Sequence, residues 1–457
     1  MPPEILTIET PELGDRSYAI IAGGEAVVVD PQRDIDRVLE LLSGRGVRVS
    51  TVAETHIHND YVSGASELCR VTGATLVIPA GESVGYPRRA IADGEEIELG
   101  ALRLVARHTP GHTATHMTYV LEEDGRPIAA FTGGSMLVGS VGRTDLTGPW
   151  VTDRLSHLQH RSARRLSNEL PDTAAILPTH GFGSLCGAGF PVGAPDTADA
   201  GHQRAENPAL VMDEDAFVRR LVAGLDAFPR YYAYIAPRNR EGAGVVDLEL
   251  PAPGDLSELA ARVAAGEWVI DLRERHAFGA KHMVGTLAFE LADPFTTYLG
   301  WLLPWGSPLS MIGSAADLAS ARRALARIGV ERIAACHFID EASADRWAGV
   351  ATESYPVVGF SELKPHIGNP GEVVVDARLG REWREGHLAT AIHIPLHELP
   401  DRLAEIPGGR VWVHCAAGYR AAVAGSLLAR AGRDVVVVSD QFSSAVDAGL
   451  EIISDCD

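Results

Sequence analysis

The sequence has few cysteines and no closely spaced cysteine pair. Its 457 residues contain five, Cys69, Cys186, Cys336, Cys415 and Cys456, and none of them forms a CxxC motif. This spread excludes a disulfide framework and a zinc knuckle, so a reducing, cytoplasmic location is expected. A basic N-terminal segment followed by an apolar one is also lacking, and no apolar run approaches the roughly 20 residues of a membrane helix. Neither export nor a membrane partner is therefore expected.

Positive charge is scarce as well. Lysine and arginine together number 40 against 61 acidic residues, which gives a formal net charge of -21 at pH 7. This surplus repels phosphate backbones, so a nucleic-acid partner is not expected. The remaining composition, 46% apolar and 22% charged, is that of a globular protein. The length predicts about three domains.

The first part of the chain, residues 1–245, alternates short β-branched segments with segments of helical periodicity, which is typical of an α/β fold. Helices are expected at Ile35–Leu42, at Ser63–Val71 and around Asp153–Leu170. The turn-rich stretch Pro229–Gly244 would close this domain. Strands are expected at Ser17–Ala22, Ala26–Asp30, Val49–Glu54, Thr75–Ile78, Leu102–His108, Met117–Leu121, Ile128–Phe131 and Ala174–Pro178.

The remaining chain contains an internal repeat. The hydrophobic segments Trp268–Arg273 and Val373–Arg378 each follow a helical segment and end in Asp-x-Arg, with Asp271 and Asp376 at the same place in each copy. A repeat of roughly 100 residues predicts two α/β domains in tandem with parallel sheets. We place them at 246–352 and 353–457.

Four histidines follow predicted strands in the first domain. His56 and His58 come directly after Val49–Glu54, His112 follows the strand that ends at His108, and His180 follows Ala174–Pro178. Imidazoles on loops at strand ends are a common way to bind Zn²⁺ or Fe²⁺. Each histidine alone would be an ordinary loop residue, but together they predict one divalent metal.

The motifs around these histidines resemble the metallo-β-lactamase superfamily. They are, in order, HxHxD at 56–60, TPGHT at 109–113, FTG followed by GRTD at 131–145, and PTHG at 178–181. The stretch 131–145 most resembles the persulfide dioxygenases. The resemblance covers about residues 1–245 and implies an αββα sandwich. In those dioxygenases iron is bound by the first histidine of HxHxD, the histidine of TPGHT and an aspartate after FTG, which implies His56 and His112 as ligands here.

Two positions depart from the family pattern. Gly134 stands where the ligand aspartate is expected, and Tyr61 stands where the dinuclear hydrolases carry a further histidine. A dinuclear site is disfavoured, because Asp60 and His180 alone would have to hold the second ion. The predicted set is therefore His56, His58 and His112 around one Fe(II) or Zn(II), with Asp60 or water completing an iron site. The alternative is a pocket that has lost its metal.

Two other residues of this domain have two interpretations each. Arg143 could bind a substrate carboxylate with both guanidinium arms, or it could pair with Asp145 and order its own loop. Cys186 could be a reactive thiol near the cleft, although a free cysteine is more often part of the packing.

The last domain contains a second reactive motif. A strand at Val411–His414 leads directly into Cys415, Ala416, Ala417, Gly418, Tyr419 and Arg420, and a small-residue helix follows. This C-x-x-G-x-R loop resembles the active-site loop of the rhodanese family, which transfers sulfane sulfur through a cysteine persulfide. The loop amides, the helix N-terminus and Arg420 would stabilise a sulfur anion on Cys415. In tyrosine phosphatases the arginine lies one residue further along, so an anion smaller than phosphate is favoured here.

The domain at 246–352 copies this scaffold without the thiol. Gly313–Asp317 stand where the loop should begin, and Cys336 belongs to the next strand. This domain is expected to be catalytically silent. Tyr298, Trp301 and Trp305 could form an interdomain contact or an ordinary core.

These features lead to one main hypothesis. It is an enzyme of persulfide metabolism that transfers sulfur through Cys415 and carries a metal-dependent, persulfide-dioxygenase-like domain. Its expected substrates are small persulfides, thiosulfate, sulfite or thiols, and a homo-oligomer is left open. One rival is a mononuclear zinc hydrolase with an auxiliary rhodanese domain. The other is a non-catalytic sulfur carrier or sensor with a vestigial metal site.

Overall fold

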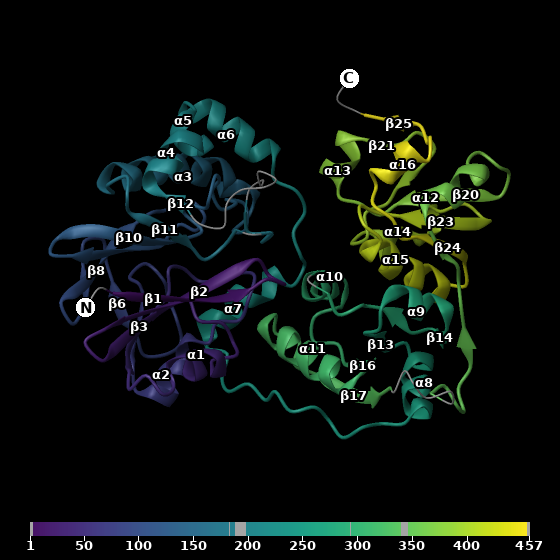
Figure 1. Cartoon of the computed structure of the whole chain (residues 1–457), viewed down its shortest axis with the longest axis horizontal. Coiled ribbons are helices and arrows are strands. Elements are labelled where there is room, and N and C mark those ends of the chain that lie inside the picture. The colour runs from purple at the N-terminus through teal and green to yellow at the C-terminus, as the bar shows by residue number, and fades with distance from the viewer. Residues whose placement is uncertain (1–2, 182, 188–197, 293, 340–345, 455–457) are drawn as a thin grey trace. The chain divides into compact units, whose positions relative to one another are not determined.

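A computed structural model describes residues 3–181, 183–187, 198–292, 294–339 and 346–454. The described chain folds into two compact units (Figure 1). The first unit extends to residue 247 and includes 326–329, and the second comprises the rest from residue 248 onward. Among the described residues, no helix has both the length and the apolar content needed to span a bilayer.

The first unit contains two six-stranded sheets. The first sheet has the order β1-β2-β3-β4-β5-β6 and the second the order β12-β11-β10-β9-β8-β7. The strands of the first sheet are β1 Glu4–Thr10, β2 Asp15–Ala22, β3 Glu25–Val29, β4 Arg48–Ala53, β5 Thr75–Pro79 and β6 Arg89–Ile91. Those of the second are β7 Glu96–Leu99, β8 Leu102–His108, β9 Met117–Glu123, β10 Arg126–Gly133, β11 Ala175–Pro178 and β12 Ala198–Asp199.

Side-chain alternation along these strands builds three apolar layers. In β3, Val27 and Val29 point into the core between the two sheets, whereas Val28 points to the outer face. That outer face is covered by α1 (Asp36–Leu42), α2 (Ala65–Thr72) and α7 (Tyr232–Glu241). The outer face of the second sheet packs against α3 (Pro149–Glu169), α4 (Ala200–Glu206), α5 (Pro208–Val211) and α6 (Glu214–Ala223). The predicted αββα sandwich is confirmed.

Helix α7 is a departure from the sequence analysis. The stretch that composition marks as turn-rich contains a ten-residue helix with Pro237 inside it. Proline removes one helical hydrogen bond. Ile235 is fully buried in this helix, and Ala236 packs against the core of the first sheet. Tertiary packing therefore outweighs a weak local preference.

The second unit contains two parallel sheets. The middle module has the sheet order β15-β13-β16-β17, and the C-terminal module has the order β19-β24-β23-β20-β22. Every neighbouring pair in both sheets is parallel, as predicted. The strands are β13 Trp268–Asp271, β15 Leu287–Ala288, β16 Leu309–Gly313, β17 Ile333–Phe338, β19 Val357–Val358, β20 Glu372–Asp376, β22 Ile392–His393, β23 Arg410–His414 and β24 Asp434–Val438.

Shorter elements complete the two modules. Two antiparallel strand pairs lie outside the main sheets, β14 (His282–Met283) with β18 (Thr352–Glu353) and β21 (His387–Leu388) with β25 (Ile452–Ile453). The helices of the middle module are α8 Leu256–Ala264, α9 Arg275–Ala280, α10 Phe295–Leu302 and α11 Ala315–Arg327. Those of the C-terminal module are α12 Phe360–Leu363, α13 Gly380–Glu385, α14 Leu399–Arg402, α15 Tyr419–Arg430 and α16 Ser444–Asp447.

The repeat extends to individual side chains. Asp271 accepts hydrogen bonds from Arg273, and Asp376 accepts the same set of bonds from Arg378. The strand register then aligns the two possible active-site loops, because Asp271 lies opposite Ile312 and Asp376 lies opposite His414.

Gly313 therefore occupies the position of Cys415 in the middle module. Helix α11 begins at Ala315, almost directly after Gly313, so the middle module has no room for a six-residue loop. Cys336 lies on β17, as the sequence indicates.

Candidate functional site

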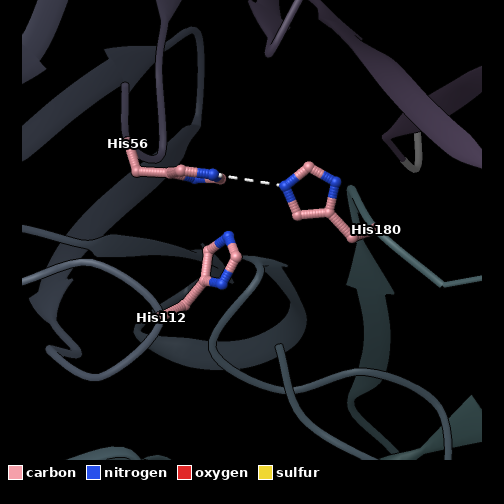
Figure 2. Close-up of side chains that lie close together, drawn as sticks. All are labelled: His56, His112 and His180. Carbon is pink, nitrogen blue, oxygen red and sulfur yellow. Dashed lines mark hydrogen bonds between the residues drawn. The ribbon is translucent and has the colours of Figure 1, made fainter. Parts of the chain in front are cut away.

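The histidines of the first unit converge where strands of both sheets end. His56 follows β4, His112 follows β8 and His180 follows β11. All three side chains are buried, and one ring nitrogen from each lies within 4.8 Å of the others. Figure 2 shows the three rings facing a common point from three different loops. The structure therefore brings together His56, His112 and His180.

The Nδ1 atom of two of these rings is fixed by a hydrogen bond. Nδ1 of His112 donates to the carbonyl oxygen of Arg143 at 2.7 Å. Nδ1 of His180 lies 2.9 Å from a carboxylate oxygen of Asp15 and 3.1 Å from one of Asp60. A ring that donates from Nδ1 keeps a lone pair on Nε2. Nε2 of His112 is buried and has no hydrogen-bond partner among the described residues.

Nδ1 of the third ring, that of His56, is also fixed by a hydrogen bond, in this case to a threonine. The hydroxyl of Thr55 donates to a buried carboxylate oxygen of Asp30 at 2.7 Å and lies 2.8 Å from Nδ1 of His56. Since the hydroxyl proton is used by Asp30, Nδ1 of His56 must be the donor to Thr55. The Nε2 lone pair of His56 then faces Nε2 of His180 at 3.2 Å (Figure 2).

This donor set fits a divalent metal. Two facing lone pairs at 3.2 Å repel each other unless a positive charge lies beside them. A proton on His180 would satisfy that pair but would leave the buried Nε2 of His112 without a partner. A cation bound by all three nitrogens satisfies every ring, and three imidazoles with an open fourth position are a known arrangement for catalytic zinc.

The surrounding charges favour a cation at His180. Burial opposes protonation of His180, but the carboxylates of Asp60 and Asp15 outweigh it and raise the pKa of His180 to about 9. Burial, with help from Asp60, raises the pKa of Asp15 to about 8. Burial and the neighbouring His180 lower the pKa of His112 to about 3. His56 is likewise held neutral, because burial and the nearby histidines lower its pKa well below the usual value.

His58, predicted as the third ligand, makes different contacts. Its Nε2 lies 3.0 Å from a carboxylate oxygen of Glu54, 3.0 Å from the hydroxyl of Tyr61 and 3.3 Å from Asp30. Although burial opposes it, the charge of Asp30 and the bonds to Asp30 and Glu54 raise the pKa of His58 well above its usual value. Among the described residues, His58 groups with Asp60 and His180, or with Asp30 and Glu54, at ligand distances.

Gly134, where the family resemblance implies a ligand carboxylate, has no space for one. A Cβ atom at this position would lie 2.2 Å from Cδ2 of His112 and 2.8 Å from its Nε2. The amide of Gly134 donates to Nε2 of His116 at 3.0 Å, which fixes the backbone there. The ring of His112 therefore lies directly over the glycine.

Arg143 and Cys186, each of which had two interpretations, both have partners within the first unit. Arg143 forms a two-armed ion pair with Asp145 at 2.7 and 2.8 Å and lies over the ring of Phe228. These contacts are those of the loop-ordering alternative, and a role in substrate binding stays a prediction. Cys186 is fully buried, its sulfur lies 3.8 Å from the hydroxyl of Tyr232, and burial raises the pKa of its thiol well above the usual value.

The second candidate site is the loop between β23 and α15. The sulfur of Cys415 accepts backbone hydrogen bonds from Gly418 at 3.2 Å and from Ala421 at 3.4 Å. Gly418 has a φ of +88°, a conformation that glycine adopts readily and that turns its amide back toward the sulfur. Cys415 itself is 1% exposed. The loop therefore presents two amides and a helix N-terminus to one sulfur atom.

The other predicted loop residues have defined partners. The carbonyl of Ala416 accepts a bond from the amide of Phe442, and the carbonyl of Ala417 accepts one from Arg275. Tyr419 is the first residue of α15. Arg420 forms a two-armed ion pair with Glu382 at 2.5 and 2.7 Å, so Glu382 positions the guanidinium. Stabilisation of a sulfur anion by Arg420 stays a prediction.

Two known families match separate parts of the chain. Residues 12–180 match the metallo-beta-lactamase superfamily, and residues 360–447 match the rhodanese-like domain. The chain carries a metallo-β-lactamase domain followed by a rhodanese-like domain.

The similar proteins match only part of this chain. Persulfide dioxygenase ETHE1 from Bos taurus is 29% identical over 212 residues, which are 45% of this chain and 73% of that protein. A hydroxyacylglutathione hydrolase-like protein from Homo sapiens is 39% identical over 120 residues, 26% of this chain and 41% of that protein. The chain thus spans less than half the length of this relative.

One solved structure resembles more than the metallo-β-lactamase domain. A metallo-beta-lactamase from Staphylococcus aureus subsp. aureus COL has a TM-score of 0.65 and 26% sequence identity, and it covers 74% of this chain and 98% of its own. Since the first unit is little more than half of the chain, this likeness extends into the second unit.

Sequence reasoning missed the residues that position these sites. In the metallo-β-lactamase domain Asp15, Asp30 and Thr55 orient the histidines, and Asp15 lies far from them along the chain. At the Cys415 loop, Glu382 contacts Arg420 from α13 of the same domain, and Arg275 contacts Ala417 from the middle module. The small polar residues beside the histidine motifs were a usable signal, but the sequence contains no signal that pairs Arg275 with Ala417.

Proposed function

We propose that this chain is an enzyme of sulfur metabolism whose rhodanese-like domain transfers sulfane sulfur through a persulfide on Cys415. The observation that carries the proposal is the pair of backbone amides, Gly418 and Ala421, that donate to the sulfur at the N-terminus of α15. Amides fixed in this way stabilise negative charge on sulfur both before and after it receives a second sulfur atom.

The proposed transfer has two steps. In the first, the thiolate of Cys415 attacks the outer sulfur of thiosulfate, the sulfur–sulfur bond of thiosulfate breaks, and sulfite leaves with the electron pair. In the second, a nucleophile such as cyanide, sulfite or a thiolate attacks the outer sulfur of the persulfide, and the electron pair of the broken bond returns to Cys415. Because Cys415 is 1% exposed, small donors and acceptors are favoured.

The metallo-β-lactamase domain is proposed to act on a thiol derivative such as a low-molecular-weight persulfide. The residues that would bind the metal are His56, His112 and His180, with Asp15 and Thr55 holding two of the rings. Bound there, a divalent metal would supply a Lewis acid and, as iron, a redox centre for oxygen. The relatives named for persulfide oxidation and for hydrolysis support a metal-dependent reaction of a thiol derivative.

Sulfurtransfer is tested by thiosulfate:cyanide and persulfide:sulfite turnover. We expect activity in the wild type and in Cys336→Ser, a matched control at another buried cysteine, and none in Cys415→Ser. Mass spectrometry after thiosulfate treatment should find one extra sulfur atom on Cys415. Full turnover by Cys415→Ser would show that the nucleophile is wrong.

The reaction of the metallo-β-lactamase domain is tested separately. Metal analysis of the purified protein is combined with oxygen uptake on glutathione persulfide. Bound iron together with oxygen uptake would support a dioxygenase. Bound zinc without oxygen uptake would favour the alternative, a mononuclear hydrolase.

A further inference from the structure

Within the second unit, the middle module contacts the loop that holds Cys415. Arg275 is the first residue of α9, and its Nη1 donates to the carbonyl oxygen of Ala417 at 2.9 Å. The amide of Gly418 belongs to the same peptide group as that carbonyl. This amide donates to the sulfur of Cys415 at 3.2 Å. A single peptide group therefore connects the Arg275 guanidinium with the reactive sulfur.

Glu290 of the middle module contacts both Arg275 and Tyr419, the residue after Gly418. Nε of Arg275 donates to a carboxylate oxygen of Glu290 at 2.8 Å, so the guanidinium is oriented from its own module. The hydroxyl of Tyr419 donates to the backbone carbonyl of Glu290 at 3.2 Å. Contacts from Arg275 and Glu290 thus reach the residues on both sides of Gly418.

The arrangement has an electrostatic consequence. A cation that binds a peptide carbonyl withdraws electron density from the peptide group, which makes its N–H a stronger donor. The same contact restrains the peptide plane that precedes Gly418, a residue with a φ of +88°. A Cβ atom there would lie 2.8 Å from Nη1 of Arg275. Arg275 therefore affects both the direction and the strength of the hydrogen bond to the sulfur.

We propose that Arg275 is a positioning residue for the Cys415 site, so that the module lacking a thiol completes the active-site loop of its neighbour. Arg275 holds the Ala417–Gly418 peptide so that its amide stabilises the sulfur anion. The inference rests on the proposed sulfurtransferase function. The middle module has no thiol of its own at this position, because Gly313 stands where Cys415 lies in the C-terminal module. The proposal gives the middle module a supporting function instead.

The test uses the full chain with Arg275→Gln and Arg275→Lys. Arg262→Gln is the matched control, since Arg262 forms ion pairs with Glu258 and Glu267 on the same module. The first readout is the rate at which iodoacetamide alkylates Cys415 at neutral pH, which follows its thiolate fraction. The second is kcat for sulfur transfer, compared with KM.

We expect Arg275→Gln to lower the alkylation rate and kcat by roughly tenfold, the size expected for one charge-assisted contact. Arg275→Lys should recover part of the loss, and Arg262→Gln should equal the wild type. If Arg275→Gln does not fold, Glu290→Gln serves instead, because it releases the arginine from its carboxylate partner and should give a smaller loss in the same direction. Wild-type alkylation and kcat in the folded variant would overturn the proposal.

The alkylation rate separates this inference from the proposed function. It needs no turnover, so a chain without sulfurtransferase activity would still show whether Arg275 acts on Cys415. A slower alkylation of Arg275→Gln in a wild type that transfers no sulfur would retain the positioning role and reject the reaction.

Discussion

At the scale of single residues, the metal centre depends on which nitrogen of each histidine is already engaged. Three rings donate from Nδ1, to Thr55, to the Arg143 carbonyl and to Asp15, and they leave three Nε2 atoms gathered together. His58 is as deeply buried, yet its Nε2 faces Glu54 and Asp30. Burial and residue type alone do not separate the two kinds of histidine.

The third ligand can be assigned by comparing His180→Gln with His58→Gln. We expect His180→Gln to lose metal affinity by at least roughly tenfold, because it removes one of three nitrogen ligands. His58→Gln should keep about one metal per chain, since glutamine can still donate toward Glu54. Metal content after dialysis against a weak chelator measures both, and circular dichroism checks folding. If His180→Gln retained its metal and His58→Gln lost it, the result would instead support the ligand set His56, His58 and His112.

Gly134 provides a second prediction at this scale. Restoring the family carboxylate with Gly134→Asp should weaken metal binding, because the new Cβ would displace the ring of His112. Gly134→Ala introduces the same Cβ without a carboxylate and should have a similar effect. Metal titration compares the two variants with the wild type. Tighter iron binding in the aspartate variant alone would mean that the pocket adapts and that the missing ligand can be replaced.

At the scale of elements, both candidate sites lie where strands end. In the metallo-β-lactamase domain β4, β8 and β11 each deliver one histidine, and in the rhodanese-like domain β23 delivers Cys415 to the N-terminus of α15. The first turn of the helix contributes amides that have no carbonyl partner within the helix, and such amides stabilise an anion.

Glycines at the two ends of α15 test this role of the helix. Gly418 precedes the helix and Gly432 follows it, and both have a positive φ. Alanine at either position should cost about 1 kcal/mol in backbone strain. Only Gly418→Ala should abolish sulfur transfer, because its Cβ would lie 2.4 Å from the hydroxyl of Ser439 and 2.8 Å from Arg275, whereas nothing lies within 4 Å at Gly432. Thermal unfolding measures the loss of stability that the two alanine variants share, and the turnover rate measures the effect that is specific to Gly418→Ala. Equal turnover rates in the two variants would contradict the loop geometry.

At the scale of the whole molecule, each unit has its own core and its own candidate site. The groups of described residues that could bind a metal all belong to the first unit, and Cys415 belongs to the second. The net charge of -21 affects both units in the same way, since anionic substrates approach against it unless local cations intervene.

Removal of metal should therefore leave sulfurtransfer intact. We expect chelator-treated protein to retain its thiosulfate:cyanide activity while it loses any oxygen uptake, because the Cys415 loop stabilises charge with amides. The two activities are measured on the same sample before and after chelation, and metal is added back as the control. A parallel loss of sulfurtransfer, restored by metal, would show that the two sites depend on each other.

Much of the architecture could be predicted from local patterns. Short β-branched segments such as those of β2 and β3 predicted an α/β fold, and the paired Asp-x-Arg motifs at Asp271 and Asp376 predicted the repeat. The αββα sandwich was implied by the resemblance of the histidine motifs to a known superfamily. Helix α7 was missed, because the burial of Ile235 that stabilises it depends on residues distant in sequence. The role of Asp15 was missed for the same reason.

The sequence by itself determined which reactive groups the chain possesses and on which strand ends they lie, because side-chain periodicity and motif spacing are local properties. Only the tertiary structure decided which of the buried histidines face one another, and that Arg275 reaches the peptide beside Cys415. Those choices depend on hydrogen bonds and charges between residues distant along the chain, such as His180 with Asp15 and His58 with Asp30. No local pattern encodes them.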